Sequence, residues 1–198
     1  MVEYFVADLH LYHKNILNID NRPEESLQEM HDNIVKCWNS KIKEDDTVYI
    51  LGDVSLGNKK YKDKVAELVK QLNGRKILIK GNHDNEEYLK DAFDEIHKYL
   101  EIELHIEGYG KVRVILFHFP ILVWNKQHYG AVLIYGHLHR QDFYNGVVNA
   151  KLLKNAYCVS AGEIGYYPMT LQELVDKYGY DPIWYKDRNK NRDGNGEC

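Results

Sequence analysis

Five short motifs in this sequence carry side chains that commonly bind metal ions, and each directly follows an apolar run. In chain order, they are Asp8-Leu9-His10, Gly52-Asp53, Gly81-Asn82-His83-Asp84, His118 and Gly136-His137-Leu138-His139. This mixture of carboxylate, imidazole and carboxamide groups suits Mn²⁺, Fe²⁺ or Fe³⁺, Zn²⁺ and Ni²⁺ better than Ca²⁺. Because the motifs contain no cysteine, a thiolate site is excluded.

Each motif by itself is weak evidence for a metal centre. In a chain with ten histidines, an Asp-x-His or His-x-His pair is close to chance expectation, and a single His118 is more often a buried structural residue. Chance does not readily place all five motifs at the ends of apolar runs. Gathering these groups without a cation would cost several kcal/mol for each unpaired charge. The set as a whole therefore favours bound metal.

The spacing within the motifs indicates how their side chains could meet. Residues two apart in an extended segment point the same way, so Asp8 with His10, and His137 with His139, can each reach one cluster. Three motifs contain a glycine, which lets the backbone turn sharply and come close to a ligand. We therefore expect extended ligand-bearing segments joined to tight glycine turns.

Strands and helices that could position these motifs follow from the apolar pattern. Predicted strands are Val2–Ala7, Thr47–Leu51, Ile77–Lys80, Glu101–Glu107, Val112–Phe117, Ala131–Tyr135 and Ala156–Val159. Predicted helices are Glu24–Lys41, Lys60–Leu72, Glu86–Asp94 and Thr170–Tyr178. Pro23 indicates the start of the first helix, and Thr170 with Glu173 predicts a capping box at the last.

The order of these elements favours a single α/β domain over residues 1–186. Alternating strands and helices in the first half predict parallel pairing, and the strand-rich second half predicts an antiparallel return. We expect a layered domain of mixed β-sheets, arranged as a two-sheet sandwich flanked by helices. The metal centre should lie at the carboxyl ends of the strands, where open α/β sheets bind ligands. Residues 187–198 are polar and are expected to form a disordered tail.

Composition limits the classes of function. A net charge of −4 gives no broad basic surface, so charge does not indicate nucleic-acid binding, although nucleic acid is retained as an alternative substrate. No apolar stretch approaches the roughly 18–20 residues that span a bilayer, so we expect no membrane partner. Three widely spaced cysteines and the lack of a signal-peptide pattern predict a cytoplasmic protein. The oligomeric state is left open.

The order Asp-x-His, Gly-Asp, Gly-Asn-His-Asp, His, Gly-His-x-His resembles the calcineurin-like metallophosphoesterase superfamily, and no core motif is missing. Residues 7–16 and 166–171 also resemble a small single-domain bacterial and phage branch. Ala7 replaces a serine that often precedes the first aspartate, but this position does not ligate metal. The resemblance implies two metal ions that share Asp53, the first held by Asp8, His10, Asp53 and His139 and the second by Asp53, Asn82, His118 and His137.

The resemblance also implies that His83 faces the substrate, where it protonates the leaving oxygen or stabilises phosphoryl charge, and that Asp84 orients His83. Two divalent ions about 3.5–4 Å apart can clamp the attacking and leaving oxygens and activate a water. With only two carboxylates among the ligands, the centre stays cationic and attracts phosphate. His13, Arg140 and His128 are candidate substrate-binding residues, His13 because it precedes a predicted helix start.

We therefore expect a dinuclear metal-dependent phosphoesterase that hydrolyses phosphate esters with a metal-activated water. Phosphodiester or nucleotide-type substrates are favoured, and the alternatives are a phosphomonoesterase or protein-phosphatase-like activity. A catalytically silent binding module of the same fold is disfavoured, because every ligand position and His83 are retained. A metallo-β-lactamase type of hydrolase would need a His-x-His-x-Asp-His run, which is absent.

Overall fold

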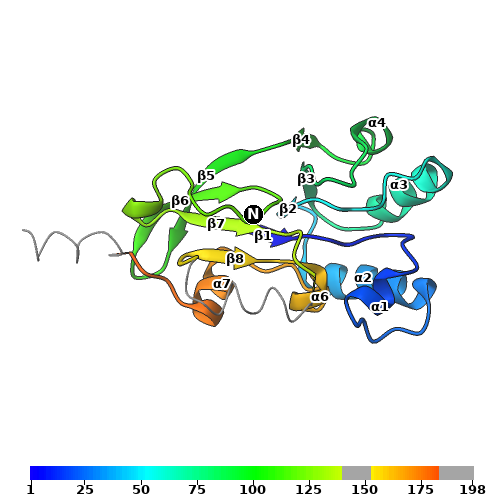
Figure 1. Cartoon of the computed structure of the whole chain (residues 1–198), viewed down its shortest axis with the longest axis horizontal. Coiled ribbons are helices and arrows are strands. Elements are labelled where there is room, and N and C mark those ends of the chain that lie inside the picture. The colour runs from blue at the N-terminus through cyan, green and yellow to red at the C-terminus, as the bar shows by residue number, and fades with distance from the viewer. Residues whose placement is uncertain (140–152, 183–198) are drawn as a thin grey trace, which may run out of the picture.

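Two four-stranded β-sheets form the centre of the protein in a computed structural model that describes residues 1–139 and 153–182 (Figure 1). The first sheet contains, in spatial order, β1 (Glu3–Val6), β2 (Thr47–Ile50), β3 (Arg75–Ile79) and β4 (Glu95–His97). The second contains β5 (Leu100–Ile106), β6 (Gly110–Leu116), β7 (Val132–Tyr135) and β8 (Ala156–Cys158). The expected α/β fold with two mixed sheets flanked by helices is therefore confirmed.

The helices of the described residues are mostly short. They are α1 (Ile16–Ile19), α2 (Leu27–Lys41), η1 (Lys59–Tyr61), α3 (Lys62–Lys70), α4 (Glu86–Leu89), η2 (Gln127–Tyr129), α6 (Ala161–Ile164) and α7 (Leu171–Tyr178). The capping box of Thr170 and Glu173 at α7 is confirmed. The predicted start of α2 near Pro23 was wrong, because the Ser26 side chain accepts the amide of Glu29 and caps a helix that begins at Leu27.

Strand pairing follows the prediction in the first sheet but only partly in the second. β1, β2, β3 and β4 are all parallel, as the alternating helices require. In the second sheet β5 and β6 are antiparallel, because the short turn between Ile106 and Gly110 allows only a hairpin. The expected antiparallel return was wrong for β6, β7 and β8, which pair in parallel. The long connection over residues 117–131 gives room for that crossover.

Side chains on both faces of the first sheet are buried, in the alternating pattern of a strand. Phe5 of β1 lies between the two sheets, in a cluster that includes Val114 of β6 and Ile134 of β7. Tyr4 and Val6 point to the opposite face and pack in a cluster with α2 and α3. The core is thus a sandwich with helices on the outer face of the first sheet.

The two sheets meet where β1 passes the end of β8. The amide of Ala7 donates to the carbonyl of Val159 at 2.8 Å, and the amide of Ala161 donates to the carbonyl of Ala7 at 2.8 Å. These bonds fix the carboxyl end of β1, where the first motif begins.

Among residues 1–139 and 153–182, no helix has the length and apolarity that crossing a membrane requires. The predicted tail 187–198 and Arg140 lie outside the described residues.

Candidate metal centre

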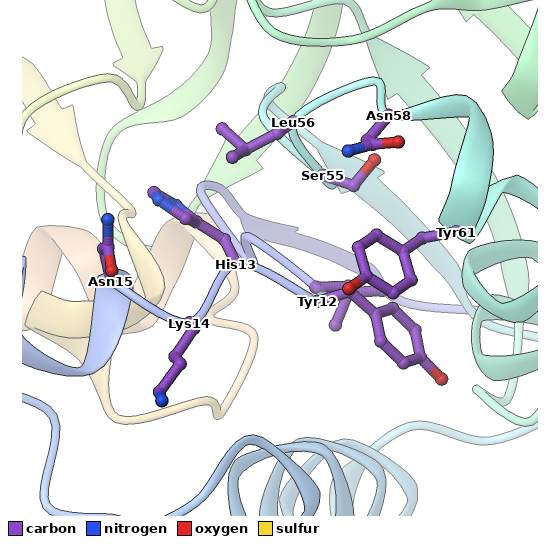
Figure 2. A pocket seen from close by; sticks show the side chains of 9 residues that line it. Tyr12, His13, Lys14, Asn15, Ser55, Leu56, Asn58 and Tyr61 are labelled. Atoms are coloured by element: carbon purple, nitrogen blue, oxygen red, sulfur yellow. The ribbon is translucent and has the colours of Figure 1, made fainter.

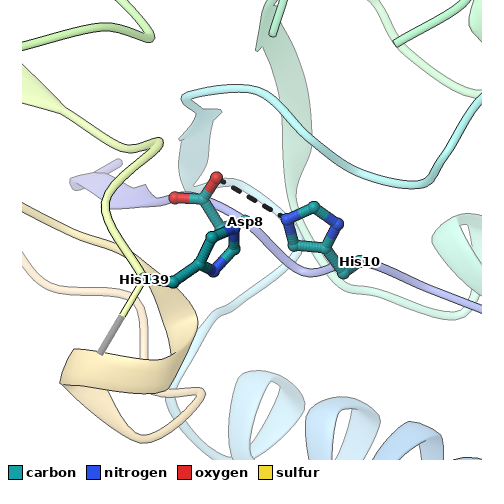
Figure 3. A group of neighbouring side chains, drawn as sticks. All are labelled: Asp8, His10 and His139. Atoms are coloured by element: carbon teal, nitrogen blue, oxygen red, sulfur yellow. Dashed lines mark ion pairs between the residues drawn. The ribbon is translucent and has the colours of Figure 1, made fainter. Parts of the chain in front are cut away.

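The five motifs converge at the carboxyl ends of strands from both sheets. One group consists of Asp8, His10 and His139, whose candidate ligand atoms lie within 4.8 Å of one another (Figure 3). A second group, within the same distance, consists of Asp53, His118 and His137. β1 and β2 of the first sheet and β6 and β7 of the second each lead into one of these residues. The sandwich therefore supplies one site from two sheets.

Asp53 lies between the two groups. Its Oδ2 is 3.9 Å from Nε2 of His10 and 3.5 Å from Nε2 of His118. Oδ1 of Asn82 lies 3.0 Å from the same nitrogen of His118. The Asp53 carboxylate is thus close to candidate ligand atoms of both groups, and a ligand shared by two metal ions needs such a position.

Several of these residues have left-handed backbone conformations. φ is +57° at Asp8, +49° at His10, +52° at Asp53 and +71° at His137. The extended segment predicted for Asp8 and His10 was therefore wrong. His137 and His139 lie in different groups, as in the two ligand sets that the resemblance implies. Such conformations cost about 1–3 kcal/mol each and persist only where the surrounding structure imposes them. Here the amides of Asp8 and His10 are held by the carbonyls of Gly52 and Asp53, at 2.9 and 3.0 Å.

The glycines of the motifs make room for the candidate ligands. A Cβ on Gly136 would lie 2.6 Å from Oδ2 of Asp8, and a Cβ on Gly81 would overlap Oδ1 of Asp53. Any side chain at either position would displace a carboxylate of the centre. The predicted close approach of the backbone is thus confirmed at these two turns.

Unsatisfied polar atoms indicate that the first group fits a cation. Oδ1 of Asp8 and Nε2 of His10 are buried without a hydrogen-bond partner and lie 4.0 Å apart. Burial raises the pKa of Asp8 to about 7 and lowers the pKa of His10 to about 3. Leaving such acceptors unpaired is unfavourable. A cation between them would satisfy both and would stabilise the ionised Asp8.

The second group is held ready for a cation by backbone contacts. His118 has its Nδ1 at 2.7 Å from the carbonyl of Leu51, so this nitrogen donates, and Nε2 faces Oδ2 of Asp53 at 3.5 Å. Burial works against ionisation of Asp53, but contact with His118 and the amide of His83 outweighs it, so the pKa of Asp53 lies below its ordinary value. The same contact with Asp53, together with the nearby Asp8 carboxylate, outweighs burial and raises the pKa of His118. The carboxylate and the imidazole therefore face one another as a close pair, and release of the Nε2 proton would leave both as ligands for a cation.

Asp20 and Arg22, which no sequence motif indicated, support the first group through hydrogen bonds to His139 and to the backbone of Asp8. Nδ1 of His139 lies 2.8 Å from Oδ1 of Asp20, and Oδ2 of Asp20 accepts from Nη2 of Arg22 at 2.9 Å. Nη2 of Arg22 also donates to the carbonyl of Asp8 at 2.7 Å. Both side chains are buried. An Asp-x-Arg pair in a polar stretch is common on protein surfaces, so no local pattern singles out these two residues.

Replacement of Asp20 by asparagine should weaken divalent-cation binding by about 10- to 100-fold, because a carboxylate behind a ligating histidine orients the ring and raises its basicity. Titration of the metal-free protein with Mn²⁺ by calorimetry measures this directly. Asp91→Asn, at an exposed aspartate after α4, is the matched control and should bind Mn²⁺ like the wild type. Unchanged affinity in Asp20→Asn would show that Asp20 does not support the centre.

His83 lies at the mouth of the centre. Its side chain is 46% exposed, and its Nε2 is 4.0 Å from Oδ2 of Asp53. Its ring centroid is 5.9 Å from that of His10. The imidazole therefore reaches both the candidate ligands and solvent, as a group that meets an incoming substrate must.

Asp84 makes contacts other than the predicted one. Its carboxylate accepts from the amides of Asp53, Val54 and Gly81, each at 2.9 Å. Among the described residues, no hydrogen bond joins Asp84 to the ring of His83. Burial raises the pKa of Asp84 to about 6. The Asp84 carboxylate thus joins the turn at Asp53 to the turn at Gly81 by hydrogen bonds. It can affect the position of His83 only through the backbone.

The three candidate substrate-binding residues are placed differently. The ring of His13 is 5.4 Å from that of His10, so His13 borders the centre. His128 lies in η2, where its ring packs against Tyr129 at 4.4 Å. Arg140 follows His139 directly but lies outside the described residues. Only His13 is therefore brought to the centre by a described contact.

Comparison with known proteins shows which family and which chains this protein resembles. Residues 4–195 match the family model described as calcineurin-like phosphoesterase. The chain is 33% identical over 174 residues to uncharacterized protein MJ1445 of Methanocaldococcus jannaschii, covering 87% of this chain and 88% of the relative. It is 31% identical over 159 residues to the Gene 66 protein of Mycobacterium phage L5, covering 69% and 76%. The solved structure of AQ665, a protein of unknown function from Aquifex aeolicus, matches with a TM-score of 0.67 and 27% identity, covering 88% and 97%.

Proposed function

Because the chain belongs to the calcineurin-like phosphoesterase family, we propose that it is a dinuclear metal-dependent enzyme that hydrolyses phosphodiester or nucleotide-type substrates. One observation carries this proposal most strongly: two groups of candidate ligands lie on either side of Asp53. Asp8, His10 and His139 would hold one cation, and Asn82, His118 and His137 the other. Asp53 would contact both.

The chemistry of hydrolysis divides between the cations and the protein. When bound, the two cations would supply Lewis acidity toward the phosphoryl oxygens and would lower the pKa of a bound water. His83, exposed at the mouth, would hold a proton at Nε2 for the leaving oxygen. Asp84 would act as a positioning residue, since it holds the backbone of the Asp53 and Gly81 turns. Asp20 and Arg22 would fix His139 and the backbone at Asp8.

The preference for diesters rests on the small phage-type relatives and on the open, half-exposed position of His83. The monoesterase or protein-phosphatase-like alternative is kept as an outcome of the test.

The free thiols of Cys37 and Cys158 fit a reducing compartment, so we also propose a cytoplasmic location.

A panel of phosphoesters with defined metals tests the proposed function. Metal-free protein reloaded with Mn²⁺, Zn²⁺, Fe²⁺ or Ni²⁺ should hydrolyse bis(p-nitrophenyl) phosphate or 2′,3′-cyclic AMP with a kcat/KM about tenfold or more above that for p-nitrophenyl phosphate, a difference of about 1.4 kcal/mol in the barrier. A chelator should abolish the activity. Faster monoester hydrolysis would contradict the diester preference. Metal binding without hydrolysis of any ester would support a silent binding module instead.

A further inference from the structure

A cavity of about 220 Å³ lies between the loop after β1 and the loop after β2 (Figure 2). Residues 11–15 line it from the first loop, and Ser55, Leu56, Asn58 and Tyr61 line it from the second. The same two loops carry Asp8, His10 and Asp53 a few residues earlier. The cavity is thus built from the continuations of two ligand-bearing segments and adjoins the metal centre through His13.

The walls of this cavity are fixed in place by backbone bonds. The amide of Leu11 donates to the carbonyl of Val54 at 2.8 Å and joins the two loops. Tyr12 has a φ of +59°, and its amide donates to Nε2 of the buried His31 at 3.1 Å. Its ring stacks on that of Tyr61, with the centroids 5.3 Å apart and the ring planes 11° from parallel. A bulky residue in the left-handed region is strained, and such strain concentrates at ligand-binding sites.

The lining suits a flat ring with a polar edge. Leu56 and His13 lie on one side of the cavity in Figure 2, and Tyr61 lies on the other, with Ser55 and Asn58 near it. The lining residues offer apolar contact, hydroxyl and carboxamide groups and one lysine, but no carboxylate. Sites for whole drug-sized ligands measure about 300–1,000 Å³, so this smaller cavity fits one part of a substrate.

His13 connects the cavity to the metal centre. Its ring is 5.4 Å from that of His10, and it also lines the cavity. Its Nδ1 is buried and has no hydrogen-bond partner among the described residues. A substrate that extends from the centre past His13 could satisfy this nitrogen with a sugar or phosphate oxygen. The position of His13 therefore indicates how one molecule could occupy both places.

We infer that the cavity binds the nucleobase of a nucleotide-type ester whose phosphorus lies at the metal centre. This inference rests on the proposed function and narrows its substrate class. Any nucleobase can stack on an aromatic side chain, whatever its identity, and this contact contributes substantially to the free energy of binding. The absence of acidic groups from the lining also suits a ligand that carries negative charge nearby.

Binding of adenosine 5′-monophosphate and of ribose 5-phosphate to the Mn²⁺-loaded protein isolates the contribution of the base. In the wild type, the nucleotide should bind about tenfold more tightly, as expected for one base in contact with an aromatic wall. Leu56→Trp places an indole in the cavity and should remove this advantage. Leu56 is 41% exposed, so the larger side chain needs no space in the core. Val2→Trp is the matched control, because Val2 is 42% exposed and precedes β1 at the opposite end from the centre.

The outcomes separate the inference from the proposed function. Equal affinities for the two ligands in the wild type would overturn the inference without any variant. Retention of the tenfold advantage in Leu56→Trp would also overturn it, since the base would then bind elsewhere. A protein that binds the nucleotide preferentially through the cavity but hydrolyses no ester would support the inference and contradict only the proposed catalysis.

Discussion

Replacement of Asp53 by asparagine should reduce kcat/KM for a diester by about 10³-fold or more, because several kcal/mol of charge stabilisation depend on the two cations. Oδ2 of Asp53 lies 3.9 Å from Nε2 of His10 in one group and 3.5 Å from Nε2 of His118 in the other, so this carboxylate is close to candidate ligands of both groups. Asparagine keeps the shape of the side chain and an oxygen that can accept the amide of His83. The loss should therefore reflect the missing charge and not a collapsed turn.

Metal content and folding distinguish the explanations for that loss. Elemental analysis should find about two metal ions per wild-type chain and a clear reduction in Asp53→Asn. Asp91→Asn, at an exposed aspartate, controls for the change in net charge. Thermal unfolding without metal should show that both variants fold. If Asp53→Asn kept its full metal content and full activity, the assignment of a shared ligand would be wrong.

Replacement of His83 by asparagine should affect substrates unequally. A positioned general acid contributes about 10²–10⁴-fold to the rate when the leaving group needs a proton. We expect a loss of that size in kcat/KM for a diester with an alkyl leaving group. Nitrophenolate leaves without protonation, so the loss for bis(p-nitrophenyl) phosphate should stay below about tenfold. The half-exposed position of His83 makes a folding defect unexpected.

The comparison between the two substrates is the decisive measurement. His105→Asn, at an exposed histidine on β5, is the matched control and should alter neither rate. Equal losses on both diesters in His83→Asn would contradict the acid role and favour stabilisation of phosphoryl charge by His83. The sequence left both roles of His83 open, proton donation and stabilisation of phosphoryl charge. The ratio of the kcat/KM values for the two diesters distinguishes them.

Backbone strain and buried support both concentrate at the metal centre. Asp8, His10, Asp53 and His137 all have positive φ. Arg22, from the chain segment before α2, holds the carbonyls of Asp8 and Leu9 at 2.7 and 2.9 Å. Fixed ligands of this kind reduce the reorganisation needed when a cation or substrate binds. The sandwich thus stabilises conformations that an isolated loop would not retain.

Local patterns in the sequence were sufficient for seven of the eight described strands and for the longer helices, but not for β4, α1 or α6, and they indicated the candidate ligands. Each apolar run directly precedes its polar motif, so the end of each strand and the residue types there could be read together. The capping box of Thr170 and Glu173 was predictable because its contacts span only three residues. Parallel pairing in the first sheet followed from the helices between its strands. All of these features depend on neighbours along the chain.

Contacts between distant segments decided the rest. The sequence could not show that β1 and β7 belong to different sheets, although the residues that follow them, Asp8, His10 and His139, lie in one group. It could not show that Asp20 would be buried against His139, 119 residues away. Nor could it show the left-handed turns at Asp8 and His10, which are imposed by the carbonyls of Gly52 and Asp53. The sequence by itself determined which groups are candidate ligands and, through the family resemblance, how they divide into two sets. Tertiary packing determined their buried support and their backbone conformations, because burial and backbone strain depend on which distant atoms come into contact.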